Sequence, residues 1–92
     1  MKLAELFASI QDMDPRSMNM IERIAYYTCN AHAVFEEARE TLDPMEIAQA
    51  EQVLHEMLQL LEKAHQTIEA PEQLAILQEA EEMIKTDYQA YQ

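Results

Sequence analysis

Two histidine-containing patterns in the sequence approach the spacings that metal sites use on helices. His55 and Glu56 begin the zinc-binding pattern His-Glu-x-x-His, in which two histidines one helical turn apart hold the metal and the glutamate acts as a base. Gln59 stands where the second histidine is required, so one nitrogen ligand is missing. Glu62 and His65 have the Glu-x-x-His spacing of di-iron bundles, but such a site needs this pattern on two helices, and it occurs once here. We therefore predict no metal site from these residues.

Glu36, Glu37 and Glu40 form a Glu-Glu-x-x-Glu pattern, which is the first half of the magnesium site in all-helical nucleotide pyrophosphatases. The second half of that site is Glu-x-x-Asp on the following helix, where further carboxylate oxygens complete the coordination of Mg²⁺. Only Glu40 and Asp43 have this spacing here, and they lie at the end of the same predicted helix. A pyrophosphatase-like enzyme is thus the third functional hypothesis, and an acidic, solvated helix face is the simpler interpretation.

His32 and Cys29 are the candidates for group-transfer chemistry. Phosphotransfer bundles present an exposed histidine beside a lysine and then a glycine that clears space for the partner, whereas Val34, Phe35 and Glu36 follow His32 here. We expect His32 to be half-buried and hydrogen-bonded. Cys29 has no basic neighbour and no helix-start position to activate it, so we expect a buried, unreactive thiol. No set of residues places a nucleophile, a base and an oxyanion donor around one atom, and we predict a non-enzymatic protein without cofactor or metal.

The elements that position these residues are separated by three prolines. Asp14-Pro15 and Asp43-Pro44 have the form of helix starts, because aspartate caps free amides and proline fits the first turn; Pro71-Glu72 is a third start. Apolar residues then recur at steps of three and four, as on a helix packed along one face. We predict helices over about residues 2–11, 16–42, 44–69 and 72–91. Their predicted buried seams are Leu3, Leu6, Phe7 and Ile10; Ile21, Ile24, Thr28, Ala31, Phe35, Ala38 and Leu42; Ile47, Ala50, Leu54, Met57, Leu61, Ala64 and Ile68; and Leu74, Leu77, Ala80, Ile84, Tyr88 and Tyr91.

Composition favours the same fold class. The 92 residues include no glycine, which removes phosphate-binding glycine loops and the usual residue of tight β-hairpins, and 49% of them are apolar. Short connections make successive long helices antiparallel. We predict an all-α fold, in which residues 1–92 form a single domain: a compact antiparallel bundle of three long helices with a short N-terminal helix across one end.

A second apolar row accompanies the seam of the first long helix. Met20, Tyr27 and Val34 follow one another at intervals of seven residues, so they share one face. The simpler interpretation assigns them to the core between three packed helices. The functional interpretation is that this face docks onto another protein or forms a homodimer.

The charge of the chain limits the class of partner. Eighteen acidic against six basic residues give a net charge of −12, which disfavours direct binding to nucleic acid or to an anionic membrane. Acidic residues are concentrated after position 35, and Glu36, Glu37 and Glu40 begin that stretch. An acidic mimic of nucleic acid that inhibits a DNA- or RNA-binding protein is therefore the alternative hypothesis.

The leading functional hypothesis is a small acidic module for protein–protein interaction: an adaptor, inhibitor or regulator that docks through a helix face. We take Met20, Tyr27, Val34, Glu36, Glu37 and Glu40 as its partner-binding residues. The partner is another protein, basic or nucleic-acid-binding in the alternative hypothesis. A single cysteine and the lack of an apolar run long enough to span a membrane lead us to expect a cytoplasmic protein.

Overall fold

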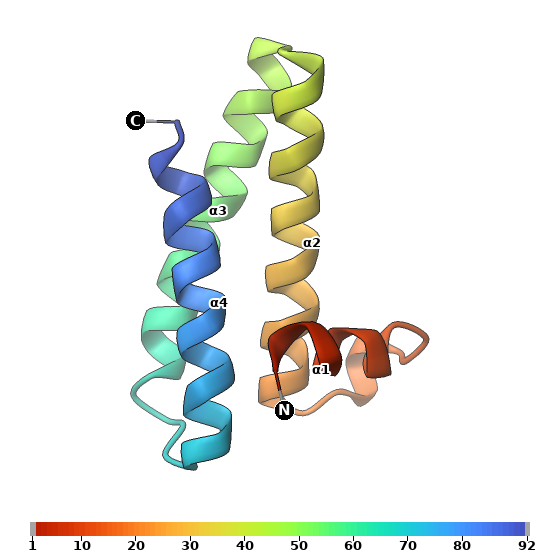
Figure 1. Ribbon diagram of the computed structural model, residues 1–92, viewed down its shortest axis with the longest axis vertical. Helices are drawn as coiled ribbons and strands as arrows, with labels where there is room; N and C mark the ends of the chain where they lie inside the picture. Colours follow the sequence, from red (N-terminus) through yellow and green to blue (C-terminus); the bar gives the residue numbers. More distant parts are fainter. Residues whose placement is uncertain (1, 92) are drawn as a thin grey trace.

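The computed structural model describes residues 2–91, and the prediction of an all-α antiparallel bundle is confirmed. A short helix α1 (Leu3–Ile10) and a 3₁₀ turn η1 (Pro15–Ser17) precede three long helices: α2 (Met20–Thr41), α3 (Pro44–Ala64) and α4 (Pro71–Gln89). The three long helices lie side by side with alternating direction, and α1 crosses the end of the bundle at which α2 begins (Figure 1). None of the helices within residues 2–91 combines the length and apolarity needed to cross a membrane.

The starts of the long helices follow from local capping. At α3 the Asp43 side chain accepts a hydrogen bond from the backbone N–H of Met45, and Pro44 occupies the first turn, as predicted. The prediction for α2 was wrong, because Asp14-Pro15 begins only the 3₁₀ turn. Helix α2 starts four residues later than predicted, after Asn19. The Asn19 side chain accepts a hydrogen bond from the Glu22 N–H, and the Glu22 carboxylate accepts one from the Asn19 N–H. This reciprocal pair is a capping box, and it fixes the helix start.

Helix α3 ends at Ala64, five residues before the predicted end. Residues 65–70 form the connection to α4, within which Ile68 is nevertheless buried. Helix α2 ends within one residue of the predicted place, but Leu42 takes the left-handed conformation there, with φ 56° and ψ 21°. Its side chain points to solvent and is 74% exposed, so its predicted place in the seam was wrong.

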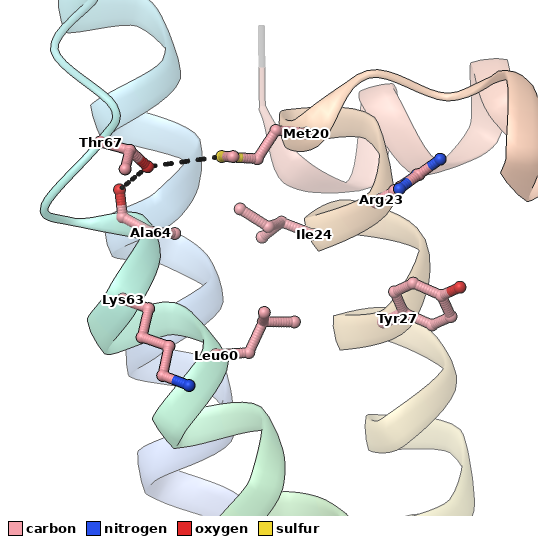
Figure 2. Close-up of a pocket in the computed structure, with 8 residues that line it drawn as sticks. All are labelled: Met20, Arg23, Ile24, Tyr27, Leu60, Lys63, Ala64 and Thr67. Atoms are coloured by element: carbon pink, nitrogen blue, oxygen red, sulfur yellow. Dashed lines mark hydrogen bonds between the residues drawn. The ribbon is translucent and has the colours of Figure 1, made fainter.

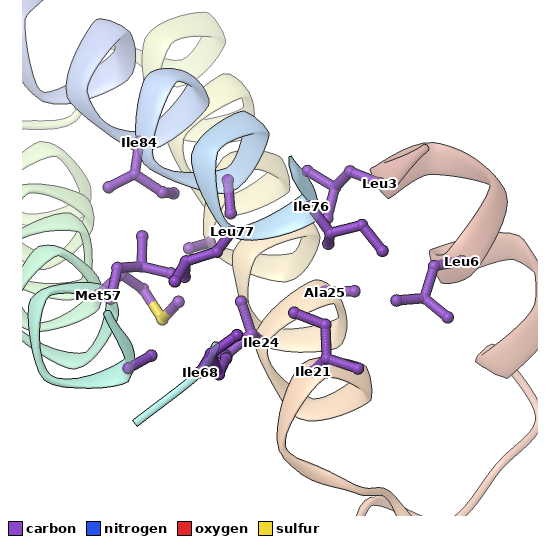
Figure 3. Packing of buried hydrophobic residues seen from close by; sticks show 14 of the residues in the cluster. Leu3, Leu6, Ile21, Ile24, Ala25, Met57, Ile68, Ile76, Leu77 and Ile84 are labelled. Atoms are coloured by element: carbon purple, nitrogen blue, oxygen red, sulfur yellow. The ribbon is translucent and has the colours of Figure 1, made fainter. Parts of the chain in front are cut away.

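Most of the other predicted seam residues are buried in the core of the bundle, but five of them are only half-buried: Phe7, Ile47, Leu74, Tyr88 and Tyr91. Ala31, Ala38, Ala50, Ala64 and Ala80 are all buried, and these small side chains allow the long helices to pack closely. Leu54, Leu61, Leu77 and Ile84 are fully buried among them (Figure 3 shows part of this cluster). Two buried residues of α4 were missed by the sequence patterns: Ile76 and Asp87.

Helix α1 covers one side of the bundle end. Leu3, Leu6 and Ile10 are buried, and Figure 3 shows Leu3 and Leu6 directed toward residues of α2 and α4. The backbone N–H of Leu3 donates to the Glu79 carboxylate of α4 at 2.7 Å, and the Phe7 ring lies 6.5 Å from the Tyr26 ring of α2. Helix α1 therefore covers only part of the groove between α2 and α4, and a hollow of about 490 Å³ remains there, lined among others by Leu3, Cys29, His32 and Met83.

The left-handed residue at the end of α2 generates a stability prediction. Leu42→Gly removes the clash between Cβ and the backbone and loses little apolar burial, so we expect the free energy of unfolding to rise by about 1 kcal/mol. Urea denaturation followed by circular dichroism at 222 nm measures this change. Glu40→Gly, in the last turn of the same helix, is the control and should lower the stability by about 0.5–1 kcal/mol. A Leu42→Gly variant that is less stable than the wild type would contradict this account.

Candidate partner-binding surface

The three apolar residues predicted to share a face of α2 are exposed together beside α3. Met20, Tyr27 and Val34 are 52%, 43% and 40% exposed, respectively. Leu60 of α3 is 43% exposed and lies across from Tyr27, as Figure 2 shows. Seven large apolar residues are exposed within residues 2–91, and these four of them share this one face. Such clustering is typical of an interaction site, whereas single exposed apolar residues are ordinary.

A continuous groove runs between α2 and α3 on this face. Its first part, near the start of α2, has a volume of about 450 Å³ and is lined by Met20, Arg23, Ile24, Tyr27, Leu60, Lys63, Ala64 and Thr67 (Figure 2). Its second part has a volume of about 360 Å³ and is lined by Tyr27, Asn30, Ala31, Val34, Val53, Glu56, Met57 and Leu60. Tyr27 and Leu60 line both parts, so the two hollows are adjacent. We call this surface the α2–α3 face.

The two ends of the α2–α3 face carry opposite charge. Arg23 and Lys63 line the end near the start of α2. The Arg23 guanidinium is held there by hydrogen bonds from Nε to the Pro15 carbonyl at 3.2 Å and from Nη2 to the Arg16 carbonyl at 3.5 Å. At the other end, a hollow of about 160 Å³ is lined by Val34, Glu37, Ala38, Glu46 and Gln49. The face is thus mainly apolar along its middle, where Asn30 and Glu56 are the polar residues, and it is basic at one end and acidic at the other.

The structure separates the predicted acidic residues from one another. Glu36, Glu37 and Glu40 are all exposed, but only Glu37 lines the α2–α3 face. The Glu36 carboxylate lies 3.7 Å from Nε2 of His32 on the same helix, and His32 in turn contacts Asp87 of α4. The apolar residues Met20, Tyr27 and Val34 are therefore brought together with Glu37, and the Glu-Glu-x-x-Glu pattern spreads over more than one side of the helix.

His32 connects α2 to α4 on the opposite side of α2. Its Nδ1 lies 2.5 Å from Oδ2 of Asp87, and the Asp87 side chain is buried. The expectation of a half-buried, hydrogen-bonded histidine is confirmed. Because a buried carboxylate without a partner is costly, this contact holds the two helices in register. Asp87 continues the three-and-four spacing after Ala80 and Ile84, so the sequence pattern is compatible with its burial. The neighbouring Tyr88 fits the same spacing, and the predicted seam contains Tyr88 in place of Asp87.

The remaining histidine patterns are also occupied by local contacts. His55 and Gln59 of α3 approach each other at 3.4 Å between the two Nε2 atoms, one turn apart. His65 contacts the carboxylate of Glu81 of α4 through Nε2, and the Glu81 carboxylate also lies 3.6 Å from Nζ of Lys85. Within residues 2–91 no three His, Cys, Asp or Glu side chains converge in a way that could hold a metal ion.

Comparison with known proteins gives no match: no family model, curated protein or solved structure is similar to this chain at a meaningful level. The surfaces of the chain are therefore the basis for proposing its function. The α2–α3 face is the strongest candidate, because it combines clustered exposed apolar residues, a continuous groove and an ordered pattern of charge.

The exposure of Tyr27 can be tested against that of a neighbour in the core. We expect Tyr27→Glu to change the free energy of unfolding by less than about 1 kcal/mol at high dilution, because the ring contacts solvent. Ile24→Glu, one turn earlier and only 2% exposed, should prevent folding by placing a charge in the core. Urea titrations of both variants measure the difference. If Tyr27→Glu also unfolds the protein, the ring belongs to the core and the α2–α3 face is not free to bind.

Cys29 provides a second prediction for the side of the molecule near His32. The thiol is only half-buried, so the expectation of a buried thiol was wrong, but partial burial still raises its pKa above the ordinary value because the thiolate is poorly solvated. At neutral pH the reactive thiolate is consequently scarcer than in a free thiol, and we expect slow modification by a disulfide reagent, becoming fast after unfolding in urea. The rate of absorbance change with Ellman's reagent measures this. Reaction as fast as that of glutathione under native conditions would contradict it.

Proposed function

We propose that the protein is a small, non-enzymatic module for protein–protein interaction, acting in the cytoplasm as an adaptor, inhibitor or regulator, and that it docks through the α2–α3 face. The observation that carries the proposal is the row of Met20, Tyr27 and Val34 on α2 opposite Leu60 on α3, all between 40% and 52% exposed. Apolar side chains arranged along a groove between two helices form a receptor for an apolar helix face.

The composition of the α2–α3 face suits binding. Tyrosine contributes a large contact area at a small cost in side-chain entropy, and its hydroxyl can remain at the wet rim of an interface. Methionine adapts its shape to the surface that it meets. Tyr27 lies at the junction of the two parts of the groove, and a partner residue seated there would touch Leu60 as well.

The exposed apolar area of the face limits the free energy that its burial can contribute to binding. Burying the exposed half of four apolar side chains contributes roughly 3–6 kcal/mol, since complete burial of one such side chain contributes about 1.5–3 kcal/mol. This gain is comparable to the entropy lost on association. The charged ends of the face, with Arg23 and Lys63 at one and Glu37 and Glu46 at the other, would add specificity and orientation.

The acidic-mimic hypothesis involves a different surface and responds differently to salt. It depends on exposed carboxylates, among them Glu36 and Glu40, and binding through such charges weakens as ionic strength rises. Docking through the apolar middle of the α2–α3 face tolerates salt. The effect of salt on a captured complex therefore distinguishes the two hypotheses.

Site-specific photo-cross-linking tests the proposal. A benzophenone amino acid replaces Tyr27 in the full chain, and in a matched control it replaces Gln78, which is exposed on α4. We expect irradiation in a lysate of the source cells to give a defined protein adduct from position 27, unchanged at high salt and lost when Val34→Glu is added. Mass spectrometry identifies the adduct.

Three results would count against docking through this face. Equal adducts from both positions would show no preference for the α2–α3 face. The absence of any adduct from position 27 would remove the proposal. An adduct that disappears at high salt would favour the acidic-mimic hypothesis instead.

A further inference from the structure

We infer that the partner for which the α2–α3 face is built is a second copy of this chain, packed as an antiparallel two-fold dimer. The inference rests on the proposed function, because it assigns a partner to the same face. It follows from the order of the charges along the groove. When one copy is turned end over end, the basic end of each copy faces the acidic end of the other.

The charges on α2 are placed symmetrically about the middle of the groove. Arg23, Asn30 and Glu37 are separated by seven residues each and line successive parts of the groove. Seven residues of α-helix correspond to about 10.5 Å along the axis. The positive and the negative side chain thus lie at equal distances on either side of Asn30.

The neighbouring helix carries a similar gradient. Lys63 lies at the same end as Arg23, and Glu46 and Gln49 lie at the same end as Glu37. Glu56 lines the middle of the groove together with Asn30. Both walls of the groove therefore run from basic to acidic in the same spatial direction, although the two helices run in opposite directions along the chain.

A two-fold axis can relate two such faces in two simple ways. If the axis is parallel to the helices, α2 packs on α3 of the second copy at the same height, and Arg23 meets Lys63. If the axis crosses the helices at the level of Asn30, each helix packs antiparallel on its own copy, and Arg23 meets Glu37. Since like charges in contact oppose association, the charge order selects the second arrangement.

The apolar residues agree with that arrangement. Tyr27 lies three residues before Asn30 and Val34 lies four residues after it, so Tyr27 of one copy would face Val34 of the other. Leu60 and Val53 are placed in the same way about Glu56. Two copies of α2 and α3 would thus form a four-helix arrangement that buries Tyr27, Val34 and Leu60 on both chains.

One feature of the face opposes the dimer and sharpens its test. Glu56 lies near the axis, so its carboxylate would approach the carboxylate of its own copy. The side chain is exposed and accepts a hydrogen bond from Gln52 at 3.1 Å. Glu56→Gln should therefore strengthen self-association, whereas a surface that plays no part in the interface would be insensitive to this change.

Charge reversal at the two ends tests the arrangement directly. Arg23→Glu and Glu37→Arg each replace two attractive contacts of the dimer by repulsive ones, and we expect each to raise the dissociation constant by about tenfold. In an equimolar mixture, the glutamate introduced at position 23 of one variant would face the arginine introduced at position 37 of the other. The mixture should therefore form a heterodimer of about wild-type affinity. Sedimentation equilibrium over a range of concentrations measures all three association constants.

Matched controls are Lys2→Glu and Glu62→Arg, exposed positions that do not line the groove, which should leave the association constant unchanged. A wild-type chain that is monomeric at every concentration overturns the inference; the proposed function survives that result if Tyr27 still cross-links to a different protein. If the equimolar mixture of Arg23→Glu and Glu37→Arg does not regain the wild-type association, the antiparallel register is overturned. A dimer whose Tyr27 cross-links to nothing overturns both proposals.

Discussion

Three long helices packed around one core create three grooves on the surface, and this chain has one short helix with which to cover them. Helix α1 lies over α2 and α4, where Leu3, Leu6 and Ile10 complete the core. Within the described part of the chain, neither the α2–α3 groove nor the α3–α4 groove receives such cover. The placement of α1 thus leaves a hollow of about 490 Å³ in the α2–α4 groove and leaves the exposed apolar row of the α2–α3 groove uncovered.

Polar contacts join α4 to both of the other long helices. The contact between His32 and the buried Asp87 joins α2 to α4, and the contact between His65 and Glu81 joins the end of α3 to α4. The closely packed alanines draw the helices together but fill little volume, so a wide apolar stripe is needed on α2 and α3. Part of that stripe remains uncovered as Met20, Tyr27, Val34 and Leu60. A core built from small residues and an exposed apolar row are thus two consequences of the same packing.

The sequence predicts the architecture well because prolines and the three-and-four spacing both carry strong helical signals. It fails at positions where two local signals compete. Asp14-Pro15 resembles a helix start as closely as Asn19 with Glu22 does; in the structure the first pair caps the 3₁₀ turn and the second pair, through its reciprocal hydrogen bonds, caps α2. The shared face of Met20, Tyr27 and Val34 follows from spacing, but its exposure depends on where α1 lies, which spacing does not determine. The basic end of the groove was missed because Arg23 and Lys63 are forty residues apart and meet only after α2 and α3 pair.

The central claim is that the α2–α3 face binds protein, and in the first instance a second copy of the chain. Methyl NMR spectra recorded during serial dilution test it most directly, because Val34, Val53 and Leu60 report on the face while Leu54, Leu61 and Leu77 report on the core. The account predicts that the methyl signals of the first group move with concentration and become accessible to a soluble paramagnetic probe on dilution. The core signals should stay unchanged. Face methyls that are equally accessible to the probe at every concentration would contradict self-association through this surface.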